Sequence, residues 1–127
     1  MASELRVNTL KDASGNNSIT TSVVFSGTPK SWVNFDQNNA SSTAEIRQSF
    51  NTSGITDEGT GLSAVSFTNN FSYADYGIGG AFNRTGTDDF LNTYYNHTTA
   101  LTNYQHYSSG SSADSDDMGA IVCGDLA

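Results

Sequence analysis

The apolar residues of this chain come in short runs that turn-forming residues separate. Ser, Thr, Asn and Gly make up 58 of the 127 residues, so the long apolar stripe of an amphipathic helix is hard to find. β-Branched and aromatic residues dominate the short runs and favour strands, while Gly, Asn, Asp and Ser between the runs favour turns. The pattern predicts an all-β chain.

The strand prediction is clearest over residues 44–50, where Ala44, Ile46 and Phe50 alternate with polar neighbours at the period of a half-buried strand. The run Asp57-Glu58-Gly59-Thr60-Gly61 predicts a hairpin turn. Further strands are expected over residues 19–25, 32–35, 62–68, 73–82, 90–95, 101–107 and 118–123, and a solvated acidic loop over 108–117. We therefore expect a single antiparallel β-sandwich or jelly-roll-like domain of seven or eight short strands over residues 18–127, preceded by an arm over residues 1–17.

Composition and charge argue against several classes of protein. No apolar run approaches the roughly 20 residues of a membrane-spanning helix, and the first residues lack the blocks of a signal peptide. Five basic against thirteen acidic residues disfavour nucleic acid as a partner. One cysteine rules out an intrachain disulfide framework. Fourteen aromatic residues and a single proline argue against disorder, although the core is thin and gains from a partner chain.

The middle of the chain resembles a module of structural proteins of tailed bacteriophages. Three strings carry the resemblance: Ser31-Trp32-Val33-Asn34-Phe35, then Glu45-Ile46-Arg47-Gln48-Ser49-Phe50-Asn51, then Ile55-Thr56-Asp57-Glu58-Gly59-Thr60-Gly61 with Val65-Ser66-Phe67-Thr68 after it. Asp75-Tyr76 and Ile121-Val122-Cys123-Gly124-Asp125 fit the same module. The opening Ser3–Gly15 is similar to the start of fibre and virion-surface proteins in phages of marine bacteria.

The resemblance implies a small virion protein, made in the bacterial cytoplasm and exposed on the particle. In that family the module commonly sits at the outer end of tail fibres, usually as a homotrimer, and works in host attachment. The expectation is a short tail fibre or fibre tip. A capsid decoration, cement or head-fibre protein and a free carbohydrate-binding module stay open as alternatives. The expected partners are copies of the chain, other virion proteins and a host glycan or protein.

A stretch rich in tyrosine and histidine is the candidate contact surface, within the loops of residues 85–117. Tyrosine stacks on sugars and supplies low-entropy contact area in interfaces. The alternative is that these side chains fill the core or a trimer interface. The candidate residues are Tyr94, Tyr95, His97, Tyr104, His106 and Tyr107.

No catalytic, metal or cofactor site is expected. His97 and His106 stand nine residues apart and form no His-x-His pair. Asp114 and Asp116 lack the rest of a calcium-loop pattern, and Gly-x-Ser-x-Gly is absent. Cys123 fits a small buried hydrophobe. The chain is therefore expected not to be an enzyme.

The N-terminal arm is the second candidate surface. Leu5, Val7 and Leu10 are apolar positions on a short extended stretch before a turn-rich segment. One interpretation is an attachment strand that docks on the virion or on a neighbouring subunit. The other is an ordinary first strand of the domain.

Overall fold

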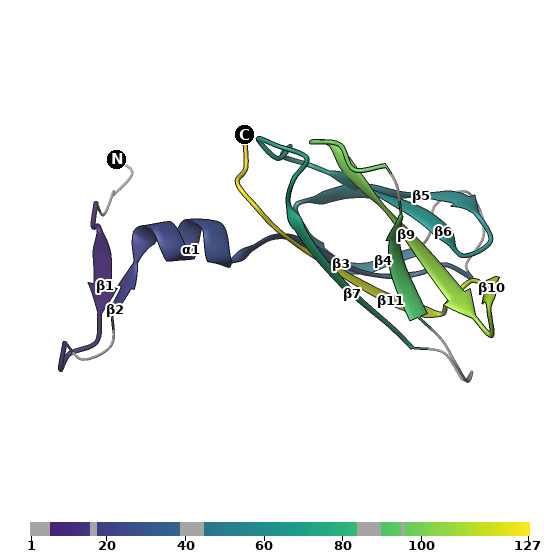
Figure 1. Cartoon of the computed structure of the whole chain (residues 1–127), viewed down its shortest axis with the longest axis horizontal. Helices are drawn as coiled ribbons and strands as arrows, with labels where there is room; N and C mark the ends of the chain where they lie inside the picture. Colours follow the sequence, from purple (N-terminus) through teal and green to yellow (C-terminus); the bar gives the residue numbers. More distant parts are fainter. Residues whose placement is uncertain (1–5, 16–17, 39–44, 84–89, 95) are drawn as a thin grey trace.

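The computed structural model describes residues 6–15, 18–38, 45–83, 90–94 and 96–127. It is mostly β, with short strands in antiparallel sheets and one short helix (Figure 1). In chain order the elements are β1 (Thr9–Lys11), β2 (Ser18–Thr20), α1 (Thr21–Gly27), β3 (Pro29–Asp36), β4 (Glu45–Phe50), β5 (Thr52–Gly59), β6 (Leu62–Phe67), β7 (Gly77–Asn83), β8 (Phe90–Tyr94), β9 (Leu101–Ser108), β10 (Ser111–Ser112) and β11 (Asp117–Cys123). This confirms the all-β, antiparallel part of the prediction.

Residues 29–127 form two sheets, and we call this part the two-sheet unit. One sheet has the strand order β4-β3-β11-β7. The other has the order β10-β9-β6-β5, with β8 also paired to β9. The sheets share one hydrophobic core, to which β3 contributes Val33 and Phe35, β6 contributes Val65 and Phe67, and β9 contributes Tyr104.

Alternation along β3 explains which face of its sheet is buried. Ser31, Val33 and Phe35 are buried, whereas Trp32 between them is exposed. Successive side chains of a strand point to opposite faces, so one face of the sheet β4-β3-β11-β7 enters the core and the other stays open. We call the open face the outer face.

The predicted hairpin is confirmed between β5 and β6. Gly59 and Gly61 both have positive φ, at 125° and 71°, a conformation that glycine adopts without the steric penalty of a side chain. Gly61 also lies where a Cβ would come 2.6 Å from the backbone oxygen of His106. The turn therefore needs glycine for two separate reasons.

The strand predicted over residues 19–25 is wrong over most of its length. Only Ser18–Thr20 is a strand, and residues 21–27 form α1. Val23 and Val24 have weak helix propensity, which is why the segment reads as a strand. The Val24 carbonyl accepts hydrogen bonds from Thr28 Oγ1 at 2.6 Å and Lys30 Nζ at 3.4 Å, so residues beyond the segment satisfy the end of the helix.

β1, β2 and α1 form what we call the N-terminal unit, residues 6–28. β2 pairs with β1 through Leu10 and Ile19, so the boundary predicted after residue 17 falls inside a hairpin. In Figure 1 the unit extends away from the two sheets. The backbone N–H of Thr21 donates to the carbonyl of Asn8 at 3.0 Å, which joins the helix to the hairpin.

Candidate interaction surfaces

The predicted tyrosine and histidine stretch does not form one surface. Tyr104 and His106 lie on β9 with no exposed area, and Tyr104 belongs to the hydrophobic core. The two residues are two positions apart on β9, so they point to the same face of the sheet, the face by which Tyr104 enters the core. Thr102, Asn103 and Gln105 on β9 are buried as well. A contact role for Tyr104 and His106 is therefore contradicted, and the alternative that the stretch fills the core holds for these two residues.

The other members of the stretch lie elsewhere. His97 is exposed; its Nδ1 lies 2.9 Å from Thr102 Oγ1, and its ring meets that of Tyr76 edge to face at 5.9 Å. Tyr107 is half-buried near the end of β9. The backbone of Tyr94 pairs with Asn103, and Tyr95 lies outside the described residues. For His97 and Tyr107 a contact role stays a prediction. Among the described residues, no group of three or more His, Cys, Asp or Glu could hold a metal ion.

The buried hydroxyl of Tyr104 has no hydrogen-bond partner within the described part of the chain. Burial raises its pKa well above the ordinary value of 10.0, and the neighbouring Tyr76 adds to the rise. The folded chain therefore keeps this hydroxyl neutral, whereas the unfolded chain ionises it near pH 10. The stability that depends on the neutral form is complete below pH 10 and falls as the pH rises above it.

We expect Tyr104→Phe to raise the free energy of unfolding by about 1 kcal/mol at pH 7, because the substitution removes a buried hydroxyl that has no hydrogen-bond partner. Above pH 10 this group should lower the free energy of unfolding of the natural chain by about 1.4 kcal/mol per pH unit. The variant lacks the group, so its loss per pH unit should be smaller by that amount. Urea unfolding at pH 7, 10 and 11 measures both effects. An equal alkaline loss in the two proteins would contradict the assignment.

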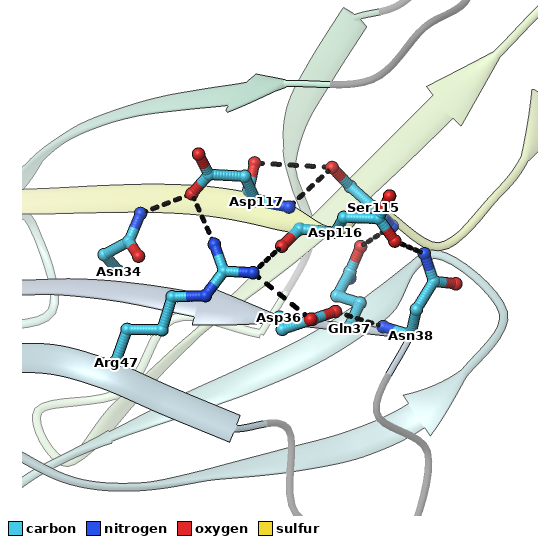
Figure 2. A network of polar contacts seen from close by, with 8 residues as sticks. All are labelled: Asn34, Asp36, Gln37, Asn38, Arg47, Ser115, Asp116 and Asp117. Carbon is cyan, nitrogen blue, oxygen red and sulfur yellow. Dashed lines mark hydrogen bonds and ion pairs between the residues drawn. The ribbon is translucent and has the colours of Figure 1, made fainter.

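A polar network closes one end of the outer face (Figure 2). The Arg47 guanidinium lies 3.2 Å from a carboxylate oxygen of Asp36 and 3.2 Å from one of Asp117, and it donates to the Asp116 carbonyl at 2.6 Å. Asn34 Nδ2 also donates to Asp117, at 2.5 Å. The network therefore ties β3, β4 and the start of β11 together. Asp116 and Asp117 belong to residues 108–117, the loop that the sequence predicts to be solvated.

Gln37 is the buried link between this network and the other sheet. Its Nε2 donates to Ser63 Oγ on β6 at 2.9 Å, and its Oε1 accepts from the Ser115 backbone N–H at 3.1 Å. Ser115 itself has no exposed area. No local pattern predicts this link, because Gln37 follows a strand in a polar segment and its partners are 26 and 78 residues away.

Gln37→Met keeps the volume of the side chain and removes both hydrogen bonds. We expect a loss of about 1–3 kcal/mol, because the Ser115 N–H and the Ser63 hydroxyl are left buried without this partner. Asn38→Ala, at the exposed neighbouring position, is the control and should change stability little. Urea unfolding compares the two. Equal losses of stability in both variants would show that the buried hydrogen bonds of Gln37 do not contribute to stability.

The N-terminal unit carries large apolar side chains that the chain does not cover. β1 and β2 are exposed throughout, and α1 has no buried residue. The exposed fractions reach 45% for Leu10, 54% for Val23 and 66% for Phe25. Val7 and Ile19 are exposed as well, and Leu5 lies outside the described residues. A lone two-stranded hairpin is at best marginally stable in water, and so is a helix of this length.

The outer face carries the second uncovered apolar surface. Phe50, Trp32, Ile121 and Gly79 are direct neighbours across β4, β3, β11 and β7. The exposed fractions are 53% for Phe50, 38% for Trp32 and 41% for Ile121. Gly119 and Gly80 help to line a shallow groove of about 350 Å³ between Trp32 and Ile121. Strict alternation around Val33 and Phe35 is the sequence signal that places Trp32 on this face.

Comparisons with known proteins add no relative. No family model matches the chain, no curated protein matches it, and no solved structure matches it. Within the described ranges, no helix combines the length and the apolar composition needed to cross a bilayer.

Proposed function

We propose that this chain is a structural subunit on the surface of a tailed-phage particle, most simply a short tail fibre or fibre tip, assembled as a homotrimer. In this proposal the two-sheet unit is a β-sandwich displayed outward. The N-terminal unit joins each subunit to the assembly. Any contact with a host glycan or protein is made by the displayed unit.

One observation carries the proposal: the two parts of the chain differ in how they bury apolar side chains. The two-sheet unit has its own core, with Phe35, Phe71 and Val65 at most 1% exposed. The N-terminal unit has exposed Leu10, Val23 and Phe25 and no buried residue in its strands or helix. A segment that cannot bury its own apolar surface needs a partner, whereas the folded part beside it has a core of its own. That division suits a displayed module with an attachment segment.

The sequence supports the same proposal. The phage-like strings lie on β3, β4, β5 and β6, so the resemblance covers adjoining strands of the two-sheet unit rather than isolated fragments. The low number of Lys and Arg residues, five in all, leaves few sites for trypsin-like proteases, which suits a protein that stays exposed for long periods.

The test is to locate the protein on purified phage particles by immunogold labelling, with antibody raised against the purified chain. Label at the tail supports a fibre or fibre tip. Label spread over the capsid would replace the fibre proposal by a decoration protein. Absence from particles that contain the other structural proteins would overturn the proposal altogether.

A further inference from the structure

We infer that the N-terminal unit of one copy packs against the outer face of the next copy, in a closed head-to-tail ring. The inference rests on the proposed function, because it names the partner of the attachment segment. It joins the two surfaces that the chain leaves uncovered: the apolar side chains of the N-terminal unit, and the row of Phe50, Trp32 and Ile121.

The N-terminal unit extends away from both sheets, so it does not lie over its own outer face (Figure 1). Lys30 Nζ donates to Thr28 Oγ1 at 2.7 Å and to the Val24 carbonyl at 3.4 Å, and it lies 5.3 Å from the centre of the Phe25 ring. Lys30 is itself on β3, so these contacts fix the end of α1 against the first residues of the strand. The outer face is left open to another copy (Figure 1).

The outer face offers a small apolar row with a groove in it, which suits an inserted side chain. A fully buried aromatic side chain contributes about 150–250 Å², and Trp32 and Phe50 are 38% and 53% exposed. With Ile121 added, the row supplies part of the ~800 Å² per partner that a standard interface buries. The groove of about 350 Å³ between Trp32 and Ile121 suits one or two inserted side chains. Phe25, 66% exposed on α1, is such a side chain.

The charges of the two units are complementary. The N-terminal unit, residues 6–28, carries two basic side chains and one acidic side chain, whereas residues 29–127 carry three basic and eleven acidic side chains. Two copies of the acidic unit repel each other, while the N-terminal unit carries a small excess of positive charge. Charge therefore favours contact between the N-terminal unit of one copy and the two-sheet unit of another over contact between two-sheet units.

A contact between two different surfaces is heterologous, and it closes into a ring when the rotation between copies closes. In the ring each copy gives its N-terminal unit once and receives one once, so both apolar surfaces of every copy become covered. The proposed homotrimer is such a ring of three.

Mixing two complementary variants tests this arrangement. The first, Val23→Gln/Phe25→Gln, removes the apolar side chains of α1 and keeps the helix, because Gln is the better helix former. The second, Trp32→Thr/Ile121→Thr, removes the outer-face row and keeps strand-forming residues. Ser26→Gln, on the same helix, is the matched control.

Light scattering should find the natural chain and Ser26→Gln as trimers of the 13.5 kDa chain, and each double variant alone as a monomer. An equal mixture of the two double variants should give a complex of two chains, because one intact N-terminal unit meets one intact outer face. Trp32 is the only tryptophan, and in the mixture it belongs to the first variant alone. Its emission should therefore shift to shorter wavelength when the second variant is added.

The remaining outcomes overturn the inference. If the N-terminal units pack only with one another, the outer-face variant assembles by itself, and Trp32 of the first variant is not shielded in the mixture. A natural chain that is monomeric with a shielded Trp32 would mean that each chain covers its own face. If the outer-face variant does not fold, acrylamide quenching of Trp32 in the natural chain and in Val23→Gln/Phe25→Gln still tests whether α1 shields Trp32. The second of these proteins is expected to fold, because α1 supplies no residue to the core. Equal quenching in the natural chain and in the α1 variant would contradict this inference. If the protein is nevertheless present on particles, the proposed function is not affected.

Discussion

Replacing Phe35 with alanine is expected to lower the free energy of unfolding by about 3–5 kcal/mol, a large part of the 5–15 kcal/mol that is typical of a domain. Phe35 has no exposed area and lies in the core cluster, on a strand with a partner at each edge. The core cluster that holds Phe35 takes residues from both sheets, among them Val65 on β6 and Met118 on β11. The surroundings are held by strand pairing, so the cavity cannot collapse fully.

Tyr73→Ala is the control, because it truncates an aromatic side chain that is 73% exposed and lies outside both proposed contact surfaces. The free energy of unfolding should change little in that variant. Urea unfolding at one protein concentration, followed by circular dichroism, compares the two, since assembly makes stability depend on concentration. If Tyr73→Ala costs as much as Phe35→Ala, burial in the core is not what makes Phe35 important.

Gly61→Ala is expected to cost about 2–6 kcal/mol, from backbone strain and overpacking together. Gly61 has φ 71°, and a Cβ there would lie 2.6 Å from the backbone oxygen of His106 and 2.7 Å from the backbone nitrogen of Ala113. Both neighbours are backbone atoms held by pairing: the His106 N–H donates to the Gly61 carbonyl, and the Ala113 N–H donates to the His106 carbonyl. The clash therefore cannot be relieved by turning a side chain.

Gly110→Ala separates the two causes. Gly110 has φ 81° and nothing within 4 Å of the Cβ position, so this control carries backbone strain alone, of about 1–3 kcal/mol. The midpoint of thermal unfolding of the two variants gives the comparison. A loss at Gly61 no greater than that at Gly110 would show that β9 and residue 113 do not crowd the turn between β5 and β6.

The parts of the fold that local sequence determines were predicted. Alternation over residues 44–50 marks β4, and two glycines mark the turn into β6. α1 was missed because its residues favour a strand and the groups that satisfy its end, Thr28 and Lys30, lie outside the segment.

Of the two candidate surfaces predicted from the sequence, one is exposed in the structure and the other is partly buried. The apolar residues of the arm were predicted as a candidate surface from sequence, and Val7 and Leu10 are exposed. Tyr104 and His106 were placed on a surface by residue type, whereas both are fully buried on β9 and Tyr104 belongs to the core that the two sheets share. Residue type does not report which face of a strand is buried, because that depends on segments far away in the sequence that pack on it.

The position of β11 bears on when the protein can fold during synthesis. β11 follows the other strands in chain order, yet it lies between β3 and β7, and its pairing with β3 joins residues 83 to 94 positions apart. Until the ribosome has made β11, β3 and β7 lack their common neighbour, and Met118, Ala120 and Val122 are missing from the core. Such long-range pairing slows folding. In a nascent chain, β3 and β7 therefore have to wait for their common neighbour until residue 123 has been translated.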